Sequence, residues 1–247
     1  MTILQNANIN GSAFPYNPSA TSSVYRYNMS QGRSYNPKKS TSNFLDVSGN
    51  GVIGTAYNIS SEYYPWKFGG MIYLNNASNT DANGKTANLN VGTSNEFTFI
   101  VAWEYVATTT GANIIAGAYP GSGNDWWIGQ LGSGYVYSFY RNGTGYTLGV
   151  APVVGRRYIA VVGNSFSTNA GYFYLFDSAG GSYSNTGILG IASSTAGTIS
   201  LGRYGGFGNY YLSRCYYGDA IYSNTYLSTT NALAIKDQIK YRYGISV

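Results

Sequence analysis

Histidine is absent from this chain of 247 residues, and cysteine occurs only once, at Cys215. Without histidine, Ser-His-Asp and Cys-His catalytic arrangements are excluded, as are zinc sites that depend on imidazole. A single cysteine excludes an intramolecular disulfide, and its place in an alternating strand predicts a buried, unreactive thiol. A chain of this length buries enough apolar surface to fold without a disulfide or a metal.

Charge and long apolar runs are scarce as well. Only 9% of the residues are charged, and the net charge of +5 comes from scattered basic residues, not from a dense stripe, so nucleic-acid binding is not expected. No run of about 18 apolar residues occurs, so membrane insertion is not expected either. The first residues, MTILQNANINGSAF, lack the basic and apolar regions of a signal peptide. We therefore expect synthesis in a cytoplasm without export.

Glycine and tyrosine are abundant instead, with 33 and 27 residues, and apolar residues recur with a period of two. The segment Glu96 to Tyr105 places Phe97, Phe99 and Trp103 on one face, which predicts a core strand. Two further β-rich runs, Tyr158 to Val162 and Gly171 to Phe176, are separated by turn-forming residues and predict a hairpin.

Many short strands without intervening helices predict an all-β fold, a two-sheet antiparallel β-sandwich. Stretches rich in Ser, Thr, Gly and Asn are interpreted as connections, at residues 75 to 95, 107 to 113, 120 to 125 and 178 to 198. One short C-terminal helix is expected. Thr229 or Thr230 is the predicted cap, and Ile235, Ile239 and Tyr243 form its apolar stripe.

Several segments in order resemble one family. The closing stretch Thr198 to Val247, the segment Leu45 to Gly51, and the runs Lys67 to Leu74, Glu96 to Tyr105 and Gly155 to Asp177 are similar to LamG-like domains of the concanavalin A-like lectin and glucanase superfamily. The resemblance implies a concanavalin A-like jelly roll over residues 24 to 247. Residues 1 to 23 carry no charge and contain Pro15 and Pro18, so they are either an N-terminal arm that docks on a neighbour or a frayed terminus.

Catalysis is not expected, although the superfamily includes glycoside hydrolases. Such enzymes need two carboxylates that flank the scissile bond. No two of the nine acidic residues lie within seven positions of each other, so no local signature of a catalytic pair exists. The acids are Asp46, Glu62, Asp81, Glu96, Glu104, Asp125, Asp177, Asp219 and Asp237.

A weak calcium-binding pattern begins at Asp46. Asp46, Ser48 and Asn50 occupy positions one, three and five of an EF-hand-like loop, with Gly51 at position six. Position twelve is Tyr57, so the bidentate acid is missing. A tight turn held by side-chain-to-backbone hydrogen bonds is the favoured interpretation, and no cofactor is expected.

Carbohydrate binding is the stronger functional hypothesis, because sugars stack on aromatic faces while amides and acids bind their hydroxyls. Two tandem tryptophans in a strand face opposite ways, so one should lie in the core and the other on the surface or in a cleft. With 17% aromatic residues, some rings are also exposed by composition alone. The candidate residues are Asn124, Asp125, Trp126 and Trp127, and, in a second Gly-rich segment, Arg203, Tyr204, Phe207 and Tyr210.

The composition favours a surface that binds other molecules. Tyr, Ser, Gly and Asn are the residues of adhesive paratopes. We therefore expect a non-enzymatic protein on the surface of a virus particle, most simply a phage capsid decoration or fibre-associated protein. Its partners would be other virion proteins and host surface glycans or proteins, and it could form a homo-oligomer. The alternative is a free-standing carbohydrate-binding module or lectin, and a glycoside hydrolase is a distant third.

Overall fold

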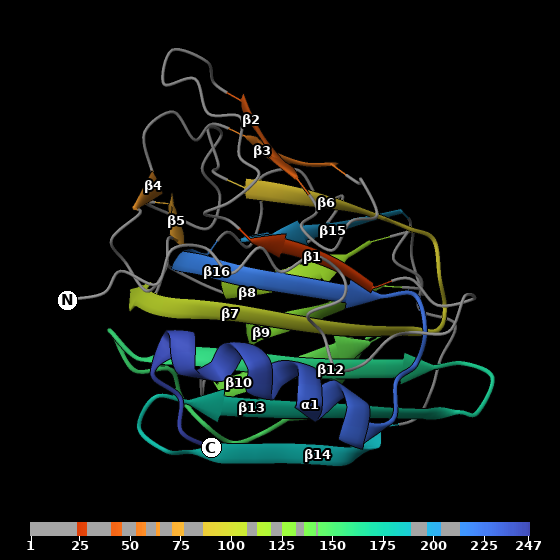
Figure 1. Cartoon of the computed structure of the whole chain (residues 1–247). Coiled ribbons are helices and arrows are strands. Elements are labelled where there is room, and N and C mark those ends of the chain that lie inside the picture. The colour runs from red at the N-terminus through yellow and green to blue at the C-terminus, as the bar shows by residue number, and fades with distance from the viewer. Residues whose placement is uncertain are drawn as a thin grey trace.

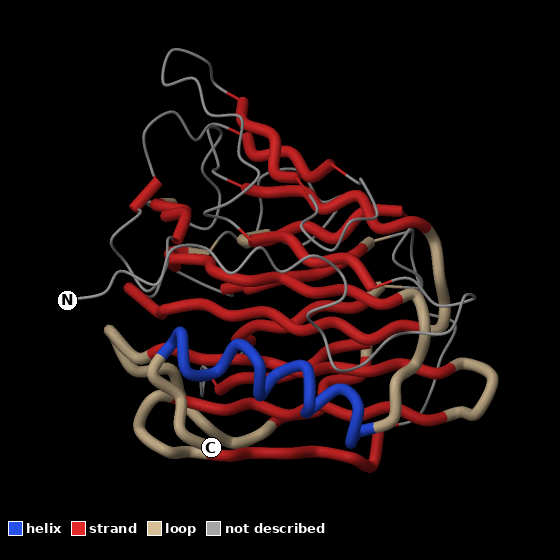
Figure 2. The backbone as a smooth tube through the Cα atoms, in the orientation of Figure 1, coloured by secondary structure: helices blue, strands red, loops and turns tan. Residues whose placement is uncertain are grey.

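A computed structural model describes twelve parts of the chain, and strands dominate it (Figure 2). The described residues are 24–28, 41–45, 53–57, 63–64, 71–76, 86–107, 113–119, 125–131, 136–141, 143–188, 197–203 and 213–247. They form two antiparallel sheets that lie face to face, with one α-helix on the outside (Figure 1). The predicted two-sheet β-sandwich with a short C-terminal helix is confirmed.

Sheet A is built around β16, which pairs with three strands. One edge of β16 pairs with β7. The other edge pairs with β5 through Arg214 to Tyr217 and with β1 through Asp219 to Ser223. From edge to edge the sheet contains β14 (Ser182–Ile188), β13 (Ala170–Asp177), β12 (Arg157–Ser165), β7 (Phe97–Ala107), β16 (Arg214–Ser223), β5 (Met71–Asn75) and β4 (Tyr63–Tyr64), and β1 (Val24–Asn28) lies beside β16.

Sheet B brings together segments that are far apart in the sequence. Strand β15 lies between β8 and β6, although about 80 residues separate it from β8 along the chain. From edge to edge the sheet contains β11 (Thr144–Thr147), β10 (Val136–Arg141), β9 (Trp126–Leu131), β8 (Asn113–Ala118), β15 (Gly197–Leu201), β6 (Thr86–Gly92), β3 (Ile53–Tyr57) and β2 (Thr41–Leu45).

The main core lies between the two sheets and is rich in aromatic rings. Phe97, Phe99 and Trp103 of β7 belong to it, as the alternation in the sequence predicts. Trp103 stacks on Tyr158 with ring centroids 5.5 Å apart and donates a hydrogen bond to the Tyr137 hydroxyl. Cys215 is buried in this core, and its burial raises the pKa of the thiol to about 12, so the predicted buried thiol is confirmed.

A second, smaller core lies on the outer face of sheet A, beneath helix α1 (Thr229–Ile239) and the 3-10 helix η2 (Lys240–Tyr243). In Figure 1 the helix lies across β12 and β13. The predicted stripe of Ile235, Ile239 and Tyr243 is buried there. Residues on the second face of β7, such as Ile100 and Ala102, are consequently buried too. Within the described residues, no helix has the length and apolar character needed to cross a membrane.

Two of the predicted connections are wrong, because they contain strands. Residues 86 to 92 form β6, where Ala87, Leu89 and Val91 enter the core while polar residues alternate with them. Residues 182 to 188 form β14, an edge strand with few buried residues. An edge strand needs little apolar content, so its sequence is easily mistaken for a loop. The predicted hairpin of β12 and β13 is confirmed.

The predicted helix caps, Thr229 or Thr230, are also wrong, by one or two residues. Ser228 is the N-cap, with an extended backbone at φ −57° and ψ 151°, and its hydroxyl accepts a hydrogen bond from the Asn231 N–H at 3.3 Å. Thr229 is already the first helical residue. Serine is at least as good a cap as threonine, and its position before the helix satisfies the free N–H groups of the first turn.

Candidate functional site

The tandem tryptophans of β9 lie on opposite faces of sheet B, as predicted. Trp126 faces inward, is fully buried, and stacks on Phe97 with ring centroids 4.9 Å apart. Trp127 faces outward and stacks on Tyr140 of β10, with centroids 4.0 Å apart and ring planes within 10° of parallel. The outer face of sheet B therefore carries a pair of stacked aromatic rings.

This stack is the end of a row of residues that runs across the outer face of sheet B. Directly paired residues on neighbouring strands share a face, and the strands are about 4.8 Å apart. We call this set the transverse row, and in order across the sheet it contains Tyr140, Trp127, Gly117, Ser200, Asn88 and Thr55.

Glycines make room for the two rings. A Cβ at Gly117 would lie 2.7 Å from Cβ of Trp127 and 2.8 Å from the backbone oxygen of Trp126. A Cβ at Gly145 of β11 would lie 2.5 Å from Cζ of Tyr140. Both distances are too short for any side chain, so the rings pack against bare backbone.

The other half of the row is polar. The Ser200 hydroxyl donates a hydrogen bond to Oδ1 of Asn88 at 2.9 Å. Nη2 of Arg203 donates to the same oxygen at 3.3 Å. A hydroxyl, an amide and a guanidinium thus converge two to three strands away from the aromatic stack. The fold thereby brings Trp127 and Arg203, which the sequence places in two separate candidate segments, onto one face.

Trp127 is less exposed than the sequence analysis expects. Of the two expected placements, on the surface or in a cleft, an open position on the surface is wrong, because only 7% of Trp127 is exposed and Tyr140 covers one of its faces. Tyr140, Asn88 and Arg203 are half-buried, and so is Asp125, which precedes β9. The ring of Trp126 is part of the core, stacked on Phe97, and offers no open face for a sugar to stack on.

The remaining predicted site residues lie outside the described part of the chain. These are Asn124 beside the tryptophans, Tyr204, Phe207 and Tyr210 after Arg203, and the calcium candidates Asp46, Ser48 and Asn50. Among the residues that the structure does describe, no group of three His, Cys, Asp or Glu side chains is placed to hold a metal ion.

Asn88, Ser200 and Tyr140 are site residues that the sequence analysis missed. Asn88 lies in β6, where Thr86, Asn88 and Asn90 alternate with Ala87, Leu89 and Val91. That alternation is a signal for a strand with one polar face. Asn88 and Ser200 are 112 positions apart, and only the register of the sheet brings their side chains together. No local pattern in the sequence indicates this contact.

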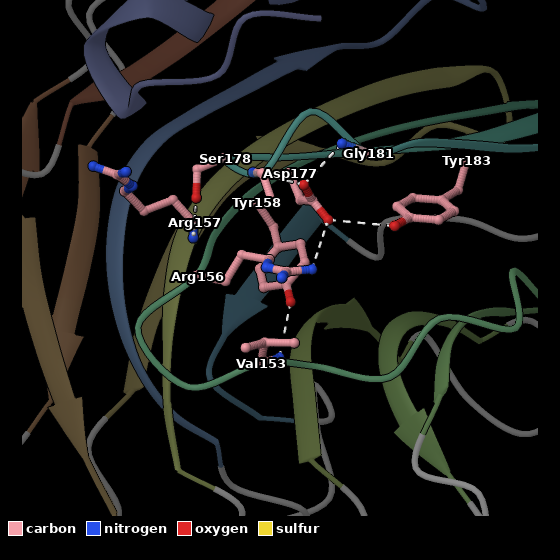
Figure 3. Close-up of polar contacts among 9 residues, drawn as sticks. Val153, Arg156, Arg157, Tyr158, Asp177, Ser178, Gly181 and Tyr183 are labelled. Atoms are coloured by element: carbon pink, nitrogen blue, oxygen red, sulfur yellow. Dashed lines mark hydrogen bonds and ion pairs between the residues drawn. The ribbon is translucent and has the colours of Figure 1, made fainter.

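A buried carboxylate, Asp177 at the end of β13, is shown in Figure 3. Its Oδ1 accepts hydrogen bonds from the N–H groups of Ala179 at 2.8 Å and Gly181 at 2.9 Å. Its Oδ2 forms an ion pair with Nη1 of Arg156 at 3.1 Å and accepts a hydrogen bond from the Tyr183 hydroxyl at 3.4 Å. Both oxygens are occupied by donors, so Asp177 holds the turn between β13 and β14.

The tyrosine beside this ion pair is not an acid or base at neutral pH. The hydroxyl of Tyr158 accepts a hydrogen bond from the N–H of Val153 at 2.9 Å (Figure 3). Burial raises the pKa of Tyr158 to about 12, and the hydrogen bond from Val153 opposes this rise. The hydroxyl therefore stays neutral, and its hydrogen bond fixes the loop that precedes β12.

Asp219 of β16 is the second fully buried carboxylate of the described residues, and it too is structural. Its Oδ2 accepts hydrogen bonds from Nη1 of Arg242 at 2.7 Å and from the Tyr243 hydroxyl at 2.8 Å. The Tyr243 hydroxyl in turn accepts from the backbone N–H of Asp219 at 2.6 Å. These bonds dock η2 on the outer face of sheet A.

Comparisons with known proteins find structural likeness only. No protein-family model matches the sequence, and no curated protein is significantly similar to it. Among solved structures, a Trypanosoma rangeli sialidase in complex with sialic acid is similar over 87% of this chain at 15% identity, with a TM-score of 0.57. This chain spans 33% of that sialidase.

Two arabinose-related enzymes supply further likenesses. Domain 4 of AbnA, a GH43 extracellular arabinanase from Geobacillus stearothermophilus, in complex with arabinotriose, has a TM-score of 0.54 at 13% identity, over 85% of this chain and 97% of that domain. A GH54 α-L-arabinofuranosidase has a TM-score of 0.56 at 13% identity, over 82% of this chain and 52% of that enzyme. At such identities the likeness concerns the fold, and this chain shares the β-sandwich architecture of domains found in glycosidases.

Proposed function

We propose that this protein is a carbohydrate-binding β-sandwich that recognises a glycan on the outer face of sheet B and does not hydrolyse it. The observation that carries the proposal is the transverse row, in which the Trp127–Tyr140 stack lies on the same face as Ser200, Asn88 and Arg203. Sugar sites combine apolar aromatic surface with a few polar groups that fix orientation. The row supplies both kinds of contact.

The spacing suits a ligand that extends across strands. Trp127 and Ser200 are two strands apart, about 10 Å at the usual strand spacing. A ligand that contacts the aromatic pair at one end can therefore bond to Asn88 and Arg203 at the other. Gly117, the one glycine of the row, lies between these groups and has no side chain that would stand between them and the ligand.

The fold neighbours support the same class of ligand. The AbnA domain is described in complex with arabinotriose, and this chain covers 97% of it. Within the β-sandwich class, we propose the concanavalin A-like, LamG-like variant. Binding without hydrolysis is favoured because the fully buried carboxylates Asp177 and Asp219 serve as structural anchors.

The test is a glycan panel with intrinsic tryptophan fluorescence as readout. Trp127→Ala and Tyr140→Ala should each lower the affinity for a bound glycan about fivefold or more, since aromatic stacking contributes on the order of 1 kcal/mol or more. Phe166→Ala is the matched control, because this ring is 53% exposed in the turn between β12 and β13, on sheet A. Near-ultraviolet circular dichroism establishes that each variant is folded. A folded Trp127→Ala protein that binds as tightly as the parent would contradict the proposal.

A location on a virion is a second proposal, which rests on composition. Abundant Tyr, Ser, Gly and Asn with few charges favour an adhesive surface, either as a capsid decoration or as a fibre-associated protein. Residues 1 to 23 directly precede β1 in the sequence, and β1 pairs with the central strand β16. Deleting them should release the protein from purified particles while the sandwich stays folded. Full retention of the truncated protein would remove the arm from this proposal.

A further inference from the structure

Arg141, the last residue of β10, is a buried cation without a hydrogen-bond partner. Its side chain points between the sheets, and only 1% of the residue is exposed. Nε, Nη1 and Nη2 all lack an acceptor. Burial lowers the pKa of the guanidinium to about 10, so Arg141 still carries its charge at neutral pH.

Three other buried charges of the described residues are paired in the structure. Asp177 pairs with Arg156, and Asp219 with Arg242. Lys236 pairs with Asp237 at 2.7 Å and donates a hydrogen bond to the Val247 carbonyl at 2.9 Å. Burying an unpaired charge costs several kcal/mol. The arrangement around Arg141 is therefore incomplete as it stands.

Among the described residues, the surroundings of Arg141 supply further donors and aromatic rings, and no carboxylate. Trp126 is its direct neighbour across β9 and β10, and Nε1 of Trp126 also lacks an acceptor. The ring of Phe139 lies 5.8 Å from the guanidinium carbon. The side chains that act on its charge are Tyr146 and Tyr226, not carboxylates. What this place lacks is an anionic acceptor.

The backbone leaves space for the guanidinium at Gly171 of β13. A Cβ at Gly171 of β13 would lie 2.6 Å from Nη1 of Arg141. Gly171 is the second residue of β13, Trp126 is the first of β9, and Arg141 ends β10. These strand ends place the guanidinium at one end of the sandwich and not in the middle of the core.

We propose that this end of the sandwich binds the carboxylate of an acidic sugar, with Arg141 and Nε1 of Trp126 as donors. Arginine binds carboxylates through two parallel hydrogen bonds, which would satisfy the guanidinium. The choice of a sugar rests on the proposed function. Arg141 and Trp126 are adjacent in sequence to Tyr140 and Trp127 on the same two strands, but their side chains face the interior, so this site and the aromatic stack lie on opposite faces of sheet B.

The binding test compares charged sugars with their neutral esters. Calorimetry is done with oligosaccharides of galacturonate, glucuronate and N-acetylneuraminate, each beside its methyl ester, and with acetate alone. The parent protein should bind at least one acid about tenfold or more tightly than its ester, and Arg141→Met should remove that preference. Lys240→Met is the matched control: it removes one cation that pairs with Asp237 at 3.1 Å on the far C-terminal segment, and it should keep the preference.

A thermal melt without ligand gives an independent readout. Because Arg141→Met replaces an unpaired buried charge by an apolar side chain of similar length, its melting temperature should rise by about 3 °C or more. Gly171→Ala should displace the guanidinium and weaken binding of the acid while leaving the charge in place.

The outcomes separate this inference from the proposed function. If no acid is preferred over its ester, or if Arg141→Met keeps the preference, the inference is wrong even where neutral glycans bind at Trp127. If acetate is bound as tightly as the sugars, the site accepts any small anion and the sugar assignment fails. If Trp127→Ala leaves both acid binding and the affinity for neutral glycans intact while Arg141→Met abolishes acid binding, the Arg141 site stands and the proposed outer-face site does not.

Discussion

The outer faces of the two sheets differ in what lies on them. On sheet A, helix α1 and η2 cover an apolar face, and Ile235, Ile239 and Tyr243 are buried against it. On sheet B, no described helix covers the face, and the transverse row combines two stacked rings with a polar cluster. The single helix therefore stabilises one face of the sandwich, and the row that carries the proposed glycan site lies on the outer face of the other sheet.

The largest expected effect is unfolding at alkaline pH. It should arise from buried tyrosines, both between the two sheets and beneath the helix on sheet A. Burial raises the pKa of Tyr137 and Tyr217 between the sheets, and of Tyr172 and Tyr243 beneath the helix. Above pH 10 the unfolded chain releases these protons and the native protein retains them, so the free energy of unfolding falls as pH rises. Four such groups give a slope on the order of 5 kcal/mol per pH unit.

Tyrosinate absorbance and circular dichroism, recorded together from pH 8 to 12, measure this effect. The buried hydroxyls should titrate in one cooperative step with the loss of structure, since the whole stability is about 5 to 15 kcal/mol. Gradual tyrosinate formation in a protein that keeps its near-ultraviolet spectrum would mean that these hydroxyls are accessible to water.

The next largest effect tests only the outer face of sheet A, which α1 and η2 cover. Tyr243→Ala removes a buried ring that packs over Gly218, together with both hydrogen bonds to Asp219. We expect a loss of about 3 to 5 kcal/mol in the free energy of unfolding, as for other buried aromatic residues. Urea denaturation measures it, and Tyr241→Ala is the control because that ring is 74% exposed on the same 3-10 helix. Equal losses for the two variants would show that η2 is not docked through Tyr243.

The smallest effect tests the outer face of sheet B. Gly117→Ala places a Cβ within 2.7 Å of Cβ of Trp127, so the tryptophan or the backbone of β9 must shift. Overpacking of this kind costs about 1 to 3 kcal/mol. The shift should also change tryptophan emission and weaken glycan binding. Gly143→Ala is a useful contrast, because nothing lies within 4 Å of its Cβ and only its φ of 76° opposes the change. Unchanged emission in Gly117→Ala would argue against the close packing of the row.

The sequence predicts the parts of the fold that depend on local alternation. The inward face of β7, the β12–β13 hairpin and the helix stripe all follow from spacing within one segment. It does not predict β6 and β14, because their polar composition is also that of loops. Nor does it predict the low exposure of Trp127, which depends on Tyr140 of the neighbouring strand.

The candidate site is harder to predict than the fold, for a physical reason. The transverse row joins strands whose residues lie far apart in the chain, such as Asn88, Gly117 and Ser200. Strand register places them side by side, and register is set by the pairing of whole strands. The tryptophan pair and Arg203 are visible as candidates because aromatic and cationic residues stand out locally.

The position of β16 has a consequence for biosynthesis. Strand β1 begins at Val24, yet its partner β16 ends at Ser223, and β16 is also a partner of β5 and β7. A nascent chain therefore carries β1, β5 and one edge of β7 without their shared partner until β16 has left the ribosome. Sheet A should close only after that point, through contacts of high sequence separation that form slowly.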